Sequence, residues 1–249
     1  MNPREYAAMF EVEDRHWWYR AVRRDVEAAL SEFARPGPLL DAGCGTGGLL
    51  ASLPLERKGE SAGVEISTEG LRLARSRGLR RLVRGSAARL PFAGGAFRAI
   101  VCIDVLAHRD VDAEQALSEF RRCLGAGGVL VLQLPAFDWL RSAHDEAVWT
   151  RRRYRKKEVE RLLSRAGFVP RRSFYRNSLL FPFAAARRLL SKRTTRGEAR
   201  SDVGPVAPFW NAAFAGVLRF ESALRRAGPR FPFGLSVFCV CEKEYDRAP

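Results

Sequence analysis

The chain has 249 residues, of which 47% are apolar and 29% charged, and its formal net charge is +15. This composition is typical of a folded globular protein and excludes a wholly disordered one. No stretch offers the roughly 18 uninterrupted apolar residues of a membrane span, and the first residues do not lead into a signal-peptide core.

Cysteine and histidine usage indicates a reducing compartment and no metal site. The five cysteines are odd in number, and most stand in apolar or glycine-rich contexts, so we expect reduced thiols and a cytoplasmic protein. The three histidines show no metal-ligand spacing. The five cysteines are Cys44, Cys102, Cys123, Cys239 and Cys241.

The positive charge is concentrated in one part of the chain. Residues 141–200 hold 18 Lys and Arg against 5 Asp and Glu, whereas the other 189 residues hold 25 against 23. Such a local surplus suits an anionic partner, namely RNA, a phospholipid surface or a phosphorylated substrate. An arginine-rich solvated surface is the alternative interpretation.

The first part of the chain alternates strands and helices. Helical spacing runs through 5–34 with an interruption at 16–19, and a Pro-Gly-Pro sequence ends this lead-in at 36–38. Strands are predicted at 39–40, 61–65, 79–83, 97–103 and 129–134. Helices are predicted directly after the first strand and its glycine turn, at 68–77, and at 112–124. A glycine-rich stretch follows the last of these helices and ends it. Strands that are apolar throughout and alternate with helices predict a doubly wound α/β sheet.

The second part of the chain departs from this pattern. A helix at 157–166 and a sixth strand at 168–175 precede a segment rich in Phe, Pro, Leu and Arg, in which helices at 179–190 and 208–226 flank a polar link at 191–204. A last strand follows at 235–242. We therefore expect one domain over 1–249, with a helical cap (1–37), a Rossmann-like core (38–176), a helical insertion (177–232) and the final strand (233–249).

Three glycines at alternate positions, Gly43, Gly45 and Gly47, stand between the first strand and its helix, where α/β sheets bind ligands. Their spacing also fits a dinucleotide site when Gly48 is counted. Asp41 separates the two alternatives, because a carboxylate here opposes a pyrophosphate and favours a cationic ligand.

The run LDAGCGTG at 40–47 resembles the first motif of class I S-adenosylmethionine (SAM)-dependent methyltransferases. SAM carries an ammonium and a sulfonium, so the resemblance implies that it binds at five residues of this run. It also implies a three-layer α/β/α fold with a seven-stranded sheet, whose last strand is antiparallel and lies beside the fifth, with the insertion over the site. The five residues are Asp41, Gly43, Cys44, Gly45 and Gly47.

Two later segments resemble further cofactor-binding motifs of the family. GVEIS at 63–67 contributes Glu65, placed to accept hydrogen bonds from ribose hydroxyls, together with Ile66. GSAARLPF at 85–92 matches the segment beside the adenine ring and contributes Ser86 and Ala87. Most relatives carry Asp where Ser86 stands, so this residue is a weaker, neutral acceptor.

Candidate residues for the transfer step follow the fourth strand. IDVLAH at 103–108 resembles a family segment that usually reads D-V-L-E-H, and it places Asp104 and Val105 at the methionine end of the cofactor or at the substrate. His108 at the mouth is a candidate general base for a hydroxyl, or an anchor of its loop. Tyr154 and His144 are further candidates, or else ordinary surface or core residues.

The run HWWYR at 16–20 resembles an N-terminal element of one bacterial branch of small-molecule methyltransferases, in which the element closes over the cofactor. His16 and Trp17 are therefore candidate cofactor contacts, since aromatic faces attract a sulfonium and exclude water. The alternative is an aromatic plug between the leading helix and the sheet.

The sequence thus predicts a SAM-dependent methyltransferase that acts on an oxygen or nitrogen nucleophile of a small or lipid-linked molecule. The insertion would either cap the site or lie on an anionic membrane surface, in which case the cytoplasmic protein would be a peripheral membrane protein. The residues that would contact the membrane are Leu179, Leu180, Phe183, Arg187 and Arg188. RNA methylation and a non-catalytic SAM-binding or membrane-adaptor protein are the alternatives, and Asp41 disfavours a NAD(P)-dependent oxidoreductase.

Overall fold

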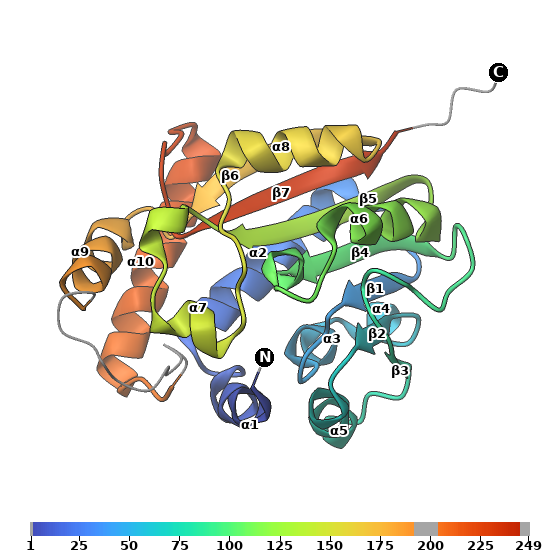
Figure 1. Ribbon diagram of the computed structural model, residues 1–249, viewed down its shortest axis with the longest axis horizontal. Coiled ribbons are helices and arrows are strands. Elements are labelled where there is room, and N and C mark those ends of the chain that lie inside the picture. The colour runs from blue at the N-terminus through green and yellow to red at the C-terminus, as the bar shows by residue number, and fades with distance from the viewer. Residues whose placement is uncertain (1, 192–203, 245–249) are drawn as a thin grey trace.

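The computed structural model describes residues 2–191 and 204–244 and is built around a seven-stranded sheet (Figure 1). The strand order is β3-β2-β1-β4-β5-β7-β6. Strands β1 to β5 are parallel, and β7 runs antiparallel between β5 and β6. The Rossmann-like sheet and the antiparallel last strand beside the fifth are confirmed. The strands are β1 (Leu39–Ala42), β2 (Ala62–Glu65), β3 (Leu82–Arg84), β4 (Phe97–Ile103), β5 (Leu124–Pro135), β6 (Phe168–Arg176) and β7 (Ser236–Lys243).

Helices cover both faces of the sheet and extend beyond one end of it. The α-helices are α1 (Pro3–Val12), α2 (Trp17–Phe33), α3 (Gly48–Ser52), α4 (Leu55–Lys58), α5 (Thr68–Ser76), α6 (Ala113–Cys123), α7 (Ala143–Ala147), α8 (Lys156–Arg165), α9 (Phe181–Ser191) and α10 (Pro208–Ala227). Two single 3-10 turns are η1 (Val105–Ala107) and η2 (Asp138–Leu140).

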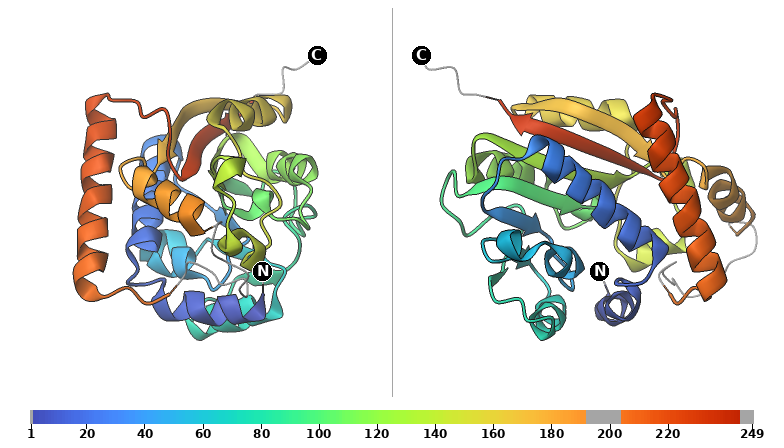
Figure 2. Two further views of the ribbon diagram at one scale, coloured as in Figure 1. Left: turned by 60° about the vertical axis from the view of Figure 1, so that its left-hand side comes forward. Right: turned by 180° about the vertical axis from the view of Figure 1, so that it is seen from behind.

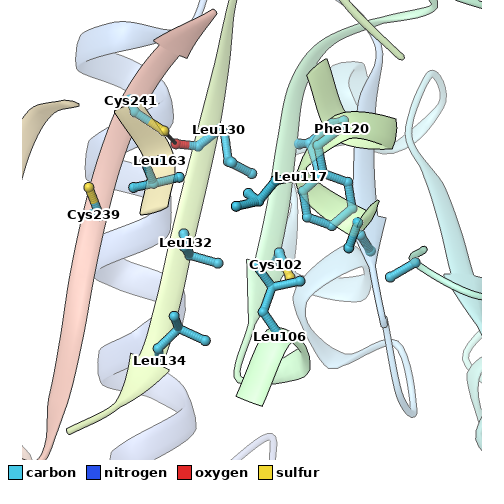
Figure 3. Close-up of a cluster of buried hydrophobic side chains, with 14 of the residues drawn as sticks. Cys102, Leu106, Leu117, Phe120, Leu130, Leu132, Leu134, Leu163, Cys239 and Cys241 are labelled. Atoms are coloured by element: carbon cyan, nitrogen blue, oxygen red, sulfur yellow. Dashed lines mark hydrogen bonds between the residues drawn. The ribbon is translucent and has the colours of Figure 1, made fainter. Parts of the chain in front are cut away.

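The central strands are apolar throughout because both of their faces are buried. Along β5, Leu130 and Leu132 pack with α6 and α8 on one face, and Val129 and Val131 pack with α2 on the other. Figure 3 shows the first cluster, in which Phe120 of α6 lies against the sheet. Burying each such side chain contributes about 1.5–3 kcal/mol, so these two clusters supply much of the stability of the fold.

The structure moves several expected boundaries. The third strand lies at Leu82–Arg84 rather than 79–83, and β5 already begins at Leu124, the last residue of the predicted helix, so that it includes the glycine-rich stretch expected to close that helix. Helices α4 and α7 are too short for a periodic signal and were not predicted.

The insertion between β6 and β7 packs beside the sheet. α9 contacts η2 and α10 contacts α2. Helix α1, at the other end of the chain, contacts the glycine turn through Met9. The link expected at 191–204 lies, except for its two end residues, outside the described residues. Within the described ranges, no helix combines the length and apolarity that crossing a bilayer requires.

Candidate functional site

The glycine turn, residues 43–48, leaves β1 at the carboxyl edge of the sheet. The backbone N–H groups of Gly43 and Cys44 donate to the Val64 carbonyl of β2, at 2.8 and 3.0 Å. Gly43 has a φ of +86°, and a Cβ there would overlap the side chain of Val105. The glycine is required for both reasons: the left-handed backbone and the close approach of the segment that follows β4.

Glu65 ends β2 and is held rigidly beside this turn. Its Oε2 accepts from the Gly45 N–H at 2.9 Å, while its Oε1 accepts from the Ser67 N–H at 2.9 Å and from the Tyr6 hydroxyl at 3.0 Å. Only 6% of the residue is exposed. A carboxylate oriented in this way, at the end of the second strand, can accept the hydroxyls of a ribose.

Asp41 makes the base of the site strongly acidic. Burial, together with the nearby carboxylates of Glu65 and Glu13, raises the pKa of Asp41 to about 8. Burial and the same carboxylates also raise the pKa of the Cys44 thiol. Without a bound ligand Asp41 is therefore mostly protonated at neutral pH; a bound cation favours its ionised form, whereas a phosphate opposes it. This set of carboxyl groups thus fits the amino-acid end of SAM and not a dinucleotide.

Helix α1 lies over the glycine turn and supplies contacts that the sequence analysis missed. Besides the hydrogen bond from Tyr6, the Met9 methyl lies 2.9 Å from where a Cβ of Gly45 would stand. Glu13 accepts a hydrogen bond from the Thr46 hydroxyl. The spacing of Tyr6, Met9 and Glu13 places them on one helical face. The acidic Glu13 on this otherwise mostly uncharged face was the sequence feature that could have indicated the contact.

The segment expected beside the adenine ring, residues 85–92, begins next to the end of β2. The Gly85 N–H donates to the Glu65 carbonyl at 3.1 Å, which brings the following residues to the end of β2. The Ser86 hydroxyl accepts from the Ala88 N–H at 3.2 Å, and Ala87 is buried. Ile66, which directly follows Glu65, is 61% exposed and so is accessible to a ligand.

Asp104 begins the segment after β4 and has one unsatisfied oxygen. Its Oδ2 accepts from Gln133 Nε2 at 3.0 Å, whereas its buried Oδ1 has no hydrogen-bond partner among the described residues. Its φ is +60°, which is uncommon for a residue other than glycine and is found at functional sites. Burial raises the pKa of Asp104 to about 6, opposed mainly by the Gln133 hydrogen bond.

Gln133 holds Asp104 by a hydrogen bond and is itself held by Arg176. The sequence analysis identified neither residue. Arg176 is 1% exposed, donates to Gln133 Oε1, and pairs with Asp25 of α2 at 2.6 Å. Gln133 is the polar residue in the otherwise apolar stretch at 129–134, which was the signal for it. The buried chain of contacts connects Asp104 to α2.

The three candidates at the mouth lie along segments that pack together. The Tyr154 hydroxyl donates to the Leu106 carbonyl at 3.3 Å, and His108 forms a backbone bridge with Thr150. Burial lowers the pKa of His108 to about 4. His144 is half-buried on α7, which carries a buried ion pair through its neighbour Asp145.

The aromatic residues at 16–19 make contacts with different parts of the structure. His16 caps α2 through its Nδ1, which accepts from the Trp18 N–H, and Trp17 lies against Phe214 of α10 at 5.3 Å. Burial, together with the carboxylates of Glu13 and Asp104, raises the pKa of the Tyr19 hydroxyl.

Comparisons with known proteins agree with this geometry. Residues 40–132 match the family model described as a methyltransferase domain, and no curated protein matches the chain.

Three solved structures share the fold. A geranyl diphosphate C-methyltransferase from Streptomyces coelicolor, complexed with Mg²⁺, geranyl diphosphate and S-adenosylhomocysteine, is 18% identical with a TM-score of 0.60, covering 90% of this chain and 77% of that one. A SAM-dependent methyltransferase from Thermotoga maritima is 21% identical with a TM-score of 0.59, covering 97% and 95%. A methyltransferase in complex with the Haloferax volcanii Trm112 activator is 17% identical with a TM-score of 0.63, covering 99% and 96%.

Proposed function

We propose that the chain is a class I SAM-dependent methyltransferase, since residues 40–132 match a methyltransferase-domain model and the fold agrees. We propose further that it methylates an oxygen or nitrogen nucleophile of a small or lipid-linked acceptor. The observation that supports the cofactor most directly is the burial of Asp41 and Glu65 together beside the glycine turn. When bound, SAM supplies an electrophilic methyl group on its sulfonium.

Each acidic residue has a distinct task in this proposal. Glu65 accepts the ribose hydroxyls, because its carboxylate is already oriented by the Gly45 and Ser67 N–H groups. Asp41 supplies negative charge at the cationic end of the cofactor. Asp104 uses its unsatisfied Oδ1 to orient an ammonium or the nucleophile. Holding the reacting groups in line in a site shielded from water lowers most of the barrier.

The environment of His108 limits how the acceptor is activated. A histidine whose pKa lies near 4 is a poor general base for a hydroxyl at neutral pH, because catalytic bases work best near the operating pH. His108 instead serves as a neutral hydrogen-bond acceptor. An acceptor that is already nucleophilic, such as a neutral amine or an ionised oxygen, suits this site best.

A small or lipid-linked acceptor agrees with the charge distribution better than RNA does. Two arginines of the basic region pair with carboxylates outside it: Arg171 with Glu242, and Arg172 with Glu32. This pairing removes part of the positive charge that motivated the RNA alternative. The buried, unpaired cysteines support the proposal of a cytoplasmic setting.

Replacing Glu65 with alanine tests the cofactor assignment. Binding of S-adenosylhomocysteine, measured by calorimetry, should weaken more than tenfold, since a charge-assisted hydrogen bond contributes about 1.5–3 kcal/mol. Glu69→Ala is the matched control, because Glu69 is a carboxylate on α5 that pairs with Arg72 at the surface. Equal affinity in wild type and Glu65→Ala would refute the assignment.

Turnover is the second test. Formation of S-adenosylhomocysteine from SAM with panels of amines, phenols and lipid-linked acceptors identifies the acceptor class. Turnover only with RNA would support the RNA alternative. Binding without turnover on any panel would support the non-catalytic alternative.

A further inference from the structure

Helix α10 presents a second apolar face to solvent, on the side opposite its contact with α2. Phe209 is 74% exposed and Phe220 is 60% exposed, three turns apart along the same side of the helix. Figure 2 (left) shows α10 as an outer helix at one edge of the molecule. The exposed apolar stripe consists of Phe209, Ala212, Gly216, Phe220, Ala223 and Ala227.

The inner side of α10 accounts for its folding but not for this stripe. Leu218 is buried against α2, and Glu221 is fully buried. A single exposed phenylalanine is ordinary, but two exposed phenylalanines joined by small exposed residues along one side of a 20-residue helix indicate an interaction site.

The charge around the stripe has one sign. In the described part of the insertion, Glu221 is the one acidic residue, and it pairs internally with Arg225 at 2.6 Å. Arg219 and Arg226, both exposed, border the stripe. Burial and the neighbouring Arg219 lower the pKa of Arg24 on α2, which shows that the positive charge continues across to that helix.

We propose that this face of α10 docks on an anionic phospholipid surface. An interfacial helix of this kind combines an apolar strip with bordering arginines, which pair with anionic headgroups while the phenylalanines enter the acyl boundary. A second copy of the chain fits the face poorly, because antiparallel two-fold pairing about the middle of the stripe would bring Arg219 close to its own copy. A single-stranded nucleic acid would need positive charge along the middle of the face, where only apolar side chains stand.

Docking would also act on the segment near the cofactor site. Asn211 of α10 accepts from the Trp17 N–H at 2.8 Å and donates to the Arg15 carbonyl at 2.9 Å. Helix α10 is therefore hydrogen-bonded to the link between α1 and α2 and to the first residue of α2. This surface is independent of which acceptor the enzyme methylates, but it would bring the site to lipid-linked acceptors.

Vesicle flotation with the full chain tests the docking surface. At about 0.1 M salt the protein should float with vesicles of equal parts phosphatidylglycerol and phosphatidylcholine, and not with pure phosphatidylcholine or at about 0.5 M salt. Phe209→Ser/Phe220→Ser should lower partitioning about tenfold or more. Leu55→Ser is the matched control, since Leu55 is 83% exposed on α4, away from α10.

Charge reversal gives an independent arm. Arg219→Glu/Arg226→Glu should abolish flotation, whereas Arg80→Glu, at an exposed position before β3, should not. Circular dichroism and S-adenosylhomocysteine binding must match wild type in every variant, so loss of flotation is not confused with unfolding or with loss of the cofactor site.

Three outcomes would overturn the proposal. The first is flotation of Phe209→Ser/Phe220→Ser equal to wild type, or no flotation of wild type with phosphatidylglycerol. The second is a wild-type dimer in light scattering that these substitutions convert to monomer. The third is binding of a labelled single-stranded RNA, without flotation, that the substitutions abolish.

Discussion

Replacing Asp41 with asparagine should stabilise the cofactor-free protein in a pH-dependent manner. The substitution keeps the size of the side chain and removes its charge. The folded-state pKa of Asp41 is about 8 against an ordinary value of 3.8, so the group favours folding fully below pH 3.8 and loses that contribution as the pH rises through 8. At pH 7, which lies about 3 pH units above the ordinary value of 3.8, the loss corresponds to about 4 kcal/mol, an upper bound because the structure relaxes.

Urea denaturation at several pH values measures this effect. Near pH 4.5, where Asp41 is protonated in the folded wild type, the two proteins should differ by no more than about 1 kcal/mol. At about pH 7.5 the variant should be more stable by several times that amount. A variant that is less stable than wild type at pH 7.5, or a difference that does not change with pH, would refute the burial and charge reasoning.

The same substitution should weaken cofactor binding. Ionising Asp41 provides the negative charge for the cation, so wild-type affinity for S-adenosylhomocysteine should rise between about pH 6 and 8, by at most tenfold per pH unit. The asparagine variant should bind more weakly and show a smaller pH slope. The pH dependence of ligand affinity in this variant measures the contribution of the ligand's own amine, because Asp41 no longer titrates.

Three further predictions concern neighbouring contacts. Tyr6→Phe should tighten S-adenosylhomocysteine binding about three- to tenfold by calorimetry, because it frees Glu65 Oε1 for the ribose; weaker binding would show that Tyr6 acts with the ligand. Gly43→Ala should lower the free energy of unfolding by about 2 kcal/mol or more, and Val105→Ala in the same chain should recover part of it. His108 stays neutral above about pH 4, so the pH profile of turnover should be the same near pH 6.5 in wild type and in His108→Asn. An inflection near pH 6.5 that is present in wild type and absent in the variant would show that His108 is the general base.

The sheet and the glycine turn were readable from the sequence because their signals are local. A strand buried on both faces must be apolar over its whole length, as at 129–134, and the chain reverses between β1 and α3 through glycines at positive φ. Asp41 was informative for the same reason, since a carboxylate beside a ligand-binding turn restricts the charge of the ligand.

Contacts between segments distant in the sequence were decided by the tertiary structure. Tyr6 reaches Glu65 across 59 residues, and Arg176 reaches Gln133 across 43, so no periodicity or motif spacing indicates either contact. The raised pKa of Asp41 likewise depends on burial and on the carboxylates of Glu65 and Glu13, which come from other segments. Which residues lie over the glycine turn, and which face of α10 stays exposed, follow from how the helices pack, because a helical pattern shows that a face is apolar but not what it meets.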